Sequence, residues 1–101
     1  LNRGDFGASA FDDPVTLVGR IRRAGFARAY LHLDLDVIDP DDFSSSLMAT
    51  AGGPSLEAVT ALVRQVVDSF DVVGFSIVEF CDRGAGARDR ERLRAALENS
   101  I

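Results

Sequence analysis

The chain has 101 residues, of which 47% are hydrophobic and 27% charged, and its formal net charge is −5. This length suits one domain with one core, and the composition is ordinary for a globular protein. The acidic balance argues against a nucleic-acid or anionic-membrane partner. No apolar run approaches the roughly 20 residues of a membrane span. The single cysteine, Cys81, favours a reducing cytoplasm.

The first predicted elements are a helix and a strand. Asp13 can cap a helix that starts at Pro14, and Gly25 is a plausible stop. Residues 28–38 read as a strand, because apolar side chains alternate along it with polar ones. The run "DPDD" ends that strand, since the residue before a proline is biased toward extended or turn conformations.

The second half repeats the pattern. Ser55 can cap a helix whose apolar stripe runs to Phe70, a strand follows at 72–80, and a charged helix covers 87–99. Strands that are apolar at most positions are typical of a parallel sheet covered on both faces. The order therefore predicts a three-layer αβα fold with a parallel sheet. Two parallel strands are too few for a sheet of their own, so we expect further strands from elsewhere.

Three carboxylates mark the ends of the two predicted strands. Asp34 and Asp36 lie near the end of the first strand and Glu79 near the end of the second. Ligands of open parallel sheets bind beyond the carboxyl ends of the strands. Residues two apart on a strand point the same way, so Asp34 and Asp36 are expected to converge. A divalent cation prefers such oxygen ligands and removes the repulsion between them.

Spacing alone leaves simpler interpretations open. Asp34 and Asp36 can equally be solvated acids at a strand end. Glu79 can form a salt bridge with an arginine of the following segment, namely Arg83, Arg88 or Arg90. His32 shares a face with Asp34, and a hydrogen-bonded core histidine is a simpler interpretation than a partner of a metal ligand.

A longer sequence pattern around Asp34 and Asp36 favours a binding site over these simpler interpretations. The segment 32–53, "HLDLDVIDPDDFSSSLMATAGG", resembles the signature segment of the ureohydrolases, the family of arginase, agmatinase and formiminoglutamase. Asp34, Asp36, Pro40 and the pair Gly52–Gly53 fall at matching positions. The later strand, "SIVEF", resembles the family strand that carries a glutamate, which Glu79 matches. The resemblance covers roughly residues 28–97.

The resemblance implies a binuclear manganese hydrolase that cleaves a guanidinium or formimino C–N bond of a small cationic substrate. Asp34 would bridge two Mn²⁺ ions, Asp36 would bind one of them, and Glu79 would receive the cationic end of the substrate. It also implies a homo-oligomer, a trimer or hexamer.

The sequence differs from the ureohydrolase pattern at several positions, and these differences bear on the expected substrate and metal site. His32 replaces the usual Ser or Thr, Ser44 stands at a second proline position, and "SSSLMATA" replaces a Gly-Thr-rich substrate loop. The family's other metal ligands, several of them histidines, lie upstream, whereas this chain has one histidine. Residues 1–101 are therefore expected to be the C-terminal part of one arginase-like domain, inactive alone and weak in Mn²⁺ binding.

Two rival functions remain. One is a Mg²⁺-dependent phosphoryl-transfer domain that uses Asp-x-Asp, with Asp34 as the nucleophile. Such domains usually place a Thr at the position of Ile38 and a Lys later, and this chain contains no Lys. The other is a non-catalytic remnant or regulatory module of the same fold.

Overall fold

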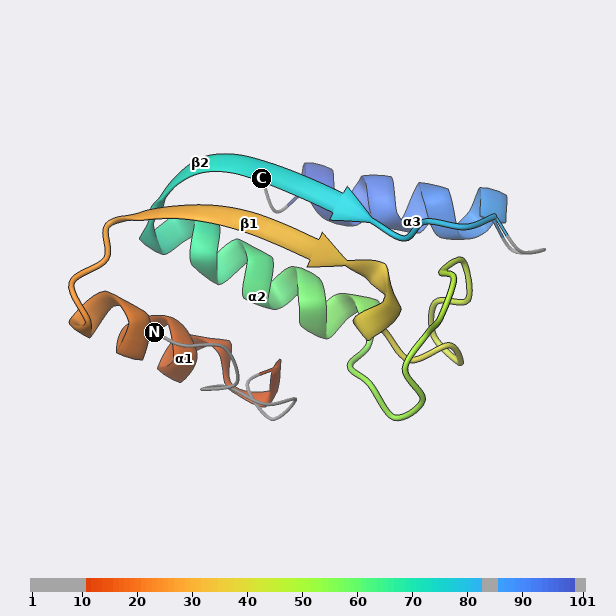
Figure 1. Ribbon diagram of the computed structural model, residues 1–101, viewed down its shortest axis with the longest axis horizontal. Helices are drawn as coiled ribbons and strands as arrows, with labels where there is room; N and C mark the ends of the chain where they lie inside the picture. The colour runs from red at the N-terminus through yellow and green to blue at the C-terminus, as the bar shows by residue number, and fades with distance from the viewer. Residues whose placement is uncertain (1–10, 83–85, 100–101) are drawn as a thin grey trace.

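A computed structural model describes residues 11–82 and 86–99. Its elements, in chain order, are α1 (Pro14–Arg23), β1 (Arg28–Asp34), the 3₁₀ turn η2 (Leu35–Val37), α2 (Leu56–Ser69), β2 (Asp71–Val78) and α3 (Gly86–Glu98) (Figure 1). None of the helices in these ranges has the length and apolar character needed to cross a membrane.

The predicted caps start the first two long helices. The Asp13 side chain accepts hydrogen bonds from the hydroxyl and the backbone N–H of Thr16, and these bonds hold the pKa of Asp13 below its usual range. The Ser55 hydroxyl accepts one from the N–H of Ala58 at 3.1 Å. The two bonds from the backbone N–H groups of Thr16 and Ala58 satisfy donors that a helix start leaves without a partner.

The two strands form a parallel pair, as the strand–helix–strand order predicts. Leu31 pairs with Phe75, and Asp34 pairs with Val78 at the carboxyl ends. Helix α2 connects the end of β1 to the start of β2 (Figure 1). The pairing fixes which residues of the two strands reach the same edge.

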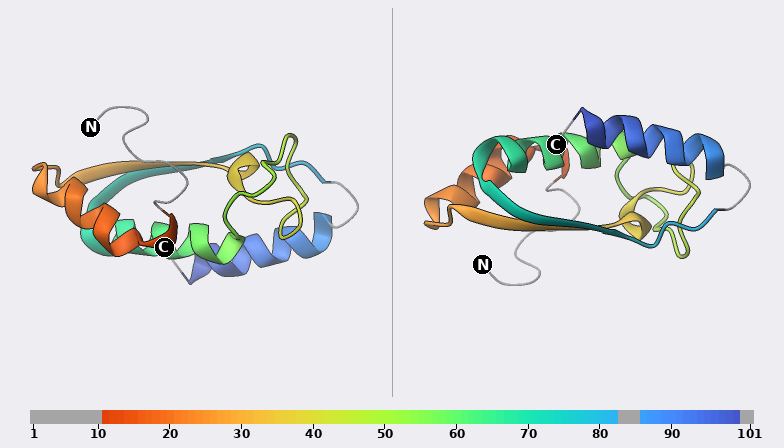
Figure 2. Two further views of the ribbon diagram at one scale, coloured as in Figure 1. Left: turned by 90° about the horizontal axis from the view of Figure 1, so that it is seen from below. Right: turned by 90° about the horizontal axis from the view of Figure 1, so that it is seen from above.

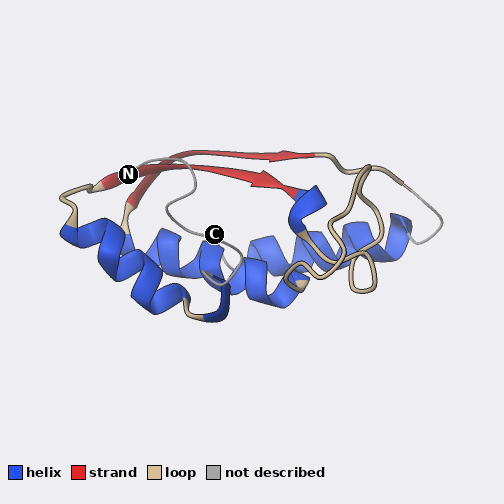
Figure 3. Cartoon of the chain, turned by 60° about the horizontal axis from the view of Figure 1, so that its bottom comes forward, coloured by secondary structure: helices blue, strands red, loops and turns tan. Residues whose placement is uncertain are grey.

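All three helices lie on one face of the sheet (Figures 2 and 3). Leu31 and Leu33 face this helical layer, whereas Tyr30, His32 and Asp34 alternate onto the opposite, exposed face. The parallel α/β fold is confirmed, and the described residues supply one helical layer of the predicted three-layer arrangement. The prediction of a core histidine is wrong, because His32 is exposed and its Nδ1 lies 2.7 Å from the Ser76 hydroxyl.

Strand β1 ends earlier than predicted. It stops at Asp34 and the chain turns into η2, whereas the sequence pattern predicted a strand to residue 38. Leu35 and Ile38 are both fully buried in the core. Residues three apart eclipse one another in a 3₁₀ turn, so the turn directs both side chains inward, which a continuing strand cannot do.

The core below the turn includes Phe43, which is 0% exposed and meets Phe80 edge-on, with ring centroids 6.4 Å apart. Phe43→Ala is expected to lower the free energy of unfolding by about 3–5 kcal/mol, because it leaves a cavity. The matched control is Phe26→Ala, since Phe26 is 50% exposed. Urea denaturation measures the free energy of unfolding of both variants. An equal decrease in the two variants would contradict the burial of Phe43 in the core.

Candidate functional site

The three predicted site residues lie at the carboxyl edge of the sheet. Asp34 is the last residue of β1 and pairs with Val78, the last residue of β2. Glu79 follows Val78 directly. The prediction that these carboxylates share one edge is therefore confirmed, and it follows from the parallel register.

Asp34 and Asp36 are held by backbone hydrogen bonds. Asp34 Oδ1 accepts from the N–H of Asp36 at 2.9 Å, which caps η2, and Asp36 Oδ1 accepts from the N–H of Met48 at 2.9 Å. The expected convergence by strand alternation is thus not the geometry seen, since Asp36 lies in the turn. No bond within the described residues uses Oδ2 of either carboxylate, so each keeps an oxygen available to a cation.

The glycine pair of the signature segment has a physical explanation. Gly52 has a φ of +79° and donates its N–H to Asp39 Oδ2 at 2.8 Å. A Cβ at Gly53 would collide with the backbone carbonyl of Val37. Both positions therefore favour glycine, and they fold the loop back against the turn that carries Asp36.

A further acid near this edge, Asp89 on α3, is not among the residues that the sequence pattern predicted. It is 3% exposed, and its Oδ2 accepts from the Ser45 hydroxyl at 2.6 Å and from the Ser45 N–H at 3.1 Å. Arg92 lies 3.6 Å from Asp89 and 3.2 Å from Asp42. A signal was present, because Asp89 lies four residues before the buried Leu93 and so shares its helix face.

Glu79 has an unusual backbone. Its φ is +72°, the one positive value among non-glycine residues in the described part of the chain. Its side chain is exposed and forms no salt bridge with a described residue. Arg90 instead lies 3.6 Å from Asp82, and Arg83 is outside the described residues. A non-glycine residue in this region is strained, and such strain gathers at functional sites.

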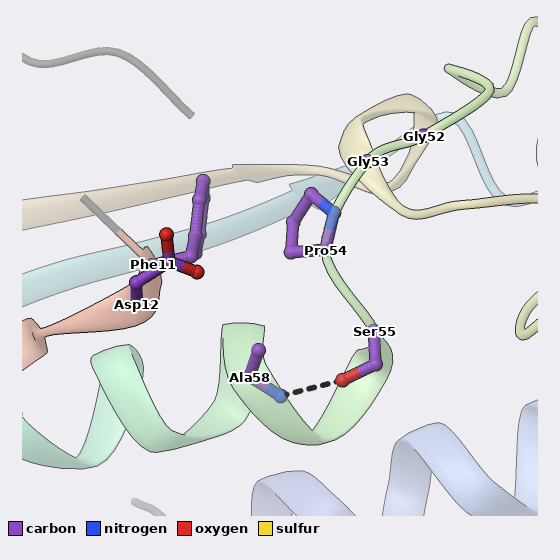
Figure 4. Close-up of a pocket in the computed structure, with 7 residues that line it drawn as sticks. All are labelled: Phe11, Asp12, Gly52, Gly53, Pro54, Ser55 and Ala58. Carbon is purple, nitrogen blue, oxygen red and sulfur yellow. Dashed lines mark hydrogen bonds between the residues drawn. The ribbon is translucent and has the colours of Figure 1, made fainter. Parts of the chain in front are cut away.

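A pocket of about 460 Å³ lies beside the glycine pair, between the start of α1 and the start of α2 (Figure 4). Its lining residues are Phe11, Asp12, Gly52, Gly53, Pro54, Ser55 and Ala58. None of the three predicted carboxylates lines it. Over residues 11–82 and 86–99, no three His, Cys, Asp or Glu side chains group closely enough to hold a metal ion. Asp34 and Asp36 are at most a partial ligand set.

No protein-family model and no curated protein matches the chain. Among solved structures it is similar to an arginase of Helicobacter pylori, with a TM-score of 0.74 and 19% identity over 94% of this chain and 35% of that one. It is also similar to a hypothetical agmatinase of Burkholderia thailandensis, with a TM-score of 0.68 and 23% identity over 96% and 35%. A third is proclavaminate amidino hydrolase of Streptomyces clavuligerus, with a TM-score of 0.67 and 27% identity over 88% and 31%.

The chain therefore has the α/β fold of these ureohydrolases, the family that its signature segment resembles. It spans between 31% and 35% of the length of these three solved structures.

The positive φ of Glu79 predicts that a glycine substitution at this position stabilises the protein. Glu79→Gly is expected to raise the free energy of unfolding by about 1 kcal/mol, because glycine adopts a positive φ without steric cost. Val78→Gly is the matched control one residue earlier, in the strand, and should lower it by about 1 kcal/mol or more. Thermal or urea unfolding measures both variants. Destabilisation by Glu79→Gly as large as that by Val78→Gly would contradict the backbone conformation.

Proposed function

We propose that this chain contributes part of the active site of a metal-dependent hydrolase that cleaves guanidino or formimino C–N bonds. The observation that carries the proposal is the common edge formed by Asp34, Asp36 and Glu79 in an arginase-like fold. Substrates with a planar cationic group suit an edge with three carboxylates. The similarity to arginase, agmatinase and amidino hydrolase structures supports the same class of reaction.

The donor chemistry of Asp34 and Asp36 fits a hard divalent cation. Each has one carboxylate oxygen fixed by a backbone N–H and one that accepts no hydrogen bond from a described residue. Following the ureohydrolase resemblance, Asp34 would bridge two Mn²⁺ ions and Asp36 would bind one of them. When bound, such ions lower the pKa of water and stabilise charge that develops during hydrolysis.

The remaining ligands would come from outside these 101 residues. The chain has a single histidine, and His32 lies on the exposed face of the sheet next to Ser76. We propose that residues 1–101 are part of one arginase-like domain of a longer protein. By itself the chain would bind Mn²⁺ weakly and show no hydrolase activity, because two carboxylates are too few for a two-metal site.

Glu79 would orient the substrate. Its carboxylate is exposed at the edge and forms no salt bridge within the described residues, so it is available to the cationic group. Its backbone has a positive φ, and it directly follows Val78, the pairing partner of Asp34 on the neighbouring strand. The substrate carbon would then lie between Glu79 and the carboxylates that hold the metal ions. By the same resemblance, the longer protein would be a homo-oligomer, a trimer or hexamer. The single cysteine, Cys81, favours a location in the reducing cytoplasm.

The two carboxylate roles predict different defects in the longer protein. Asp34→Asn should remove most Mn²⁺-dependent hydrolysis and lower the metal content, because one residue would serve both ions. Glu79→Gln should leave the metal content unchanged and lower kcat/KM, because it removes a charge that faces the substrate. Urea or ammonia release and metal analysis measure the two effects.

The control is Asp41→Asn, an exposed acid of the same segment whose side chain forms no hydrogen bond with a described residue. It should retain both metal and activity. Full metal content and full rate in Asp34→Asn would show that the site lies elsewhere. Bound Mn²⁺ with no hydrolysis by the unmodified protein would instead favour a non-catalytic module of the same fold.

A further inference from the structure

A buried hydrogen-bond network connects helix α3 to the loop beside the carboxylate edge. Asp89 is 3% exposed, and its Oδ2 accepts hydrogen bonds from the hydroxyl and the backbone N–H of Ser45, which is 0% exposed. A buried carboxylate is costly unless it is paired and hydrogen-bonded, and Arg92 lies 3.6 Å from Asp89 Oδ1. All these contacts lie inside the described residues, so further chain on the surface would leave them buried.

Ser45 is joined in turn to the segment that follows Glu79. The Ser45 carbonyl accepts a hydrogen bond from the N–H of Cys81 at 2.9 Å, and the next residue, Ser46, forms an antiparallel bridge with Phe80. These contacts attach residues 80 and 81 to residues 45 and 46. A displacement of the backbone at Ser45 would therefore also displace the chain directly after Glu79.

The backbone conformation of Glu79 depends on support from its surroundings. Its φ is +72°, in a region that residues other than glycine rarely adopt. Such a conformation persists only where neighbouring contacts impose it. Glu79 directly follows Val78, the last residue of β2, and directly precedes Phe80, which bridges to the loop. The strand on one side and the bridge on the other thus constrain the single residue between them.

The charge of Asp89 matters less to this connection than its oxygen. Arg92 also pairs with Asp42 at 3.2 Å and donates to the Asp42 carbonyl, so its charge has a second partner. The oxygen of a neutral amide can accept the same hydrogen bonds from Ser45. An asparagine at position 89 is therefore expected to preserve the connection to the loop, whereas an alanine removes it.

We propose that Asp89 is a positioning residue for the candidate site, which holds the backbone of Glu79 in place through Ser45 and the bridge at Phe80. Asp89 contacts neither substrate nor metal in this account. The inference rests on the proposed function of Glu79 as the residue that receives the cationic substrate. Loss of Asp89 then weakens substrate use and leaves the metal content unchanged, because Asp34 is held within its own turn by the N–H of Asp36.

The test measures kcat, KM and Mn²⁺ content of the full-length protein, with arginine, agmatine and formiminoglutamate as the substrates tried. Asp89→Ala should lower kcat/KM by about tenfold to a hundredfold, as expected when a substrate-binding group is misplaced by about 1 Å. Its Mn²⁺ content should equal that of the unmodified protein. Asp89→Asn should retain kcat/KM to within about threefold, because its oxygen still accepts from Ser45.

The control variant for a general loss of packing is Leu93→Ala. Leu93 is 8% exposed and lies on the same helix and in the core. This variant should lower the melting temperature at least as much as Asp89→Ala and leave kcat/KM nearly unchanged. An equal decrease in kcat/KM in both variants would overturn the inference, because the effect of Asp89 would then be one of stability alone.

A double-mutant cycle tests whether Asp89 acts through Glu79. In a protein that already carries Glu79→Gln, adding Asp89→Ala should lower kcat/KM by less than about twofold, because residues that act through one another are not additive. Ser45→Ala, which removes the hydroxyl bond and keeps the N–H bond, repeats the cycle if Asp89→Ala does not fold. Independent, multiplying losses would overturn the inference.

The remaining outcomes separate this inference from the proposed function. Full kcat/KM in folded Asp89→Ala, or loss of Mn²⁺ from it, would overturn the role of Asp89 toward Glu79 and leave the hydrolase function standing. Hydrolysis of none of the three substrates by the metal-loaded, unmodified protein would overturn the proposed function and this inference with it.

Discussion

The parallel register of β1 and β2 is the constraint on which the candidate site depends. Because Asp34 pairs with Val78, the acids that follow each strand must reach the same edge of the sheet. Helix α2 spans the distance between the two strands, and its buried side chains Leu56, Val59 and Val63 hold the sheet against the helical layer. A shift of one residue in this register would turn the apolar faces of the strands toward solvent. The site geometry is therefore protected by the hydrophobic core.

The carboxylates near this edge have structural tasks as well as the proposed chemical one. Asp34 caps the turn η2, and Asp36 accepts a hydrogen bond from the backbone N–H of Met48. Asp39 accepts hydrogen bonds from the backbone N–H groups of Asp41 and Gly52. Each uses one oxygen on a backbone N–H, which a neutral amide oxygen can also accept. The negative charge itself is therefore not required by these bonds. A bound cation or cationic substrate would explain why acids, rather than asparagines, are useful at Asp34 and Asp36.

The buried Asp89 connects the helical layer to the same edge. It fixes Ser45, and the bridge between Ser46 and Phe80 then positions the backbone at Glu79. The Ser46 hydroxyl is buried without a hydrogen-bond partner among the described residues. A loop that leaves one hydroxyl unsatisfied beside a strained glutamate is retained at some energetic cost. This combination is expected where the position of a side chain matters more than local stability.

Much of the fold follows from local patterns in the sequence. The cap at Asp13, the alternation through Leu31 and Leu33 and the apolar stripe from Leu56 predict their elements correctly. The end of β1 was predicted too late, because tertiary burial of Ile38, rather than strand propensity, decides where the chain turns.

The candidate site could be predicted only in part. Asp34, Asp36 and Glu79 were found because the carboxyl ends of parallel strands coincide. The role of Asp89 depends on a partner 44 residues away, and the positive φ of Glu79 has no local signal in a residue other than glycine. The roles of the three acids toward metal and substrate remain predictions.

Anomalous X-ray diffraction from crystals of the full-length protein grown with Mn²⁺ tests the central claim most directly. A manganese peak should appear at the carboxyl edge of the sheet, in direct contact with carboxylate oxygens of both Asp34 and Asp36, and Glu79 should face it across the substrate space without coordinating it. Ordered Mn²⁺ bound away from Asp34 and Asp36, with both carboxylates free of metal, would contradict the assignment of this edge as the active site.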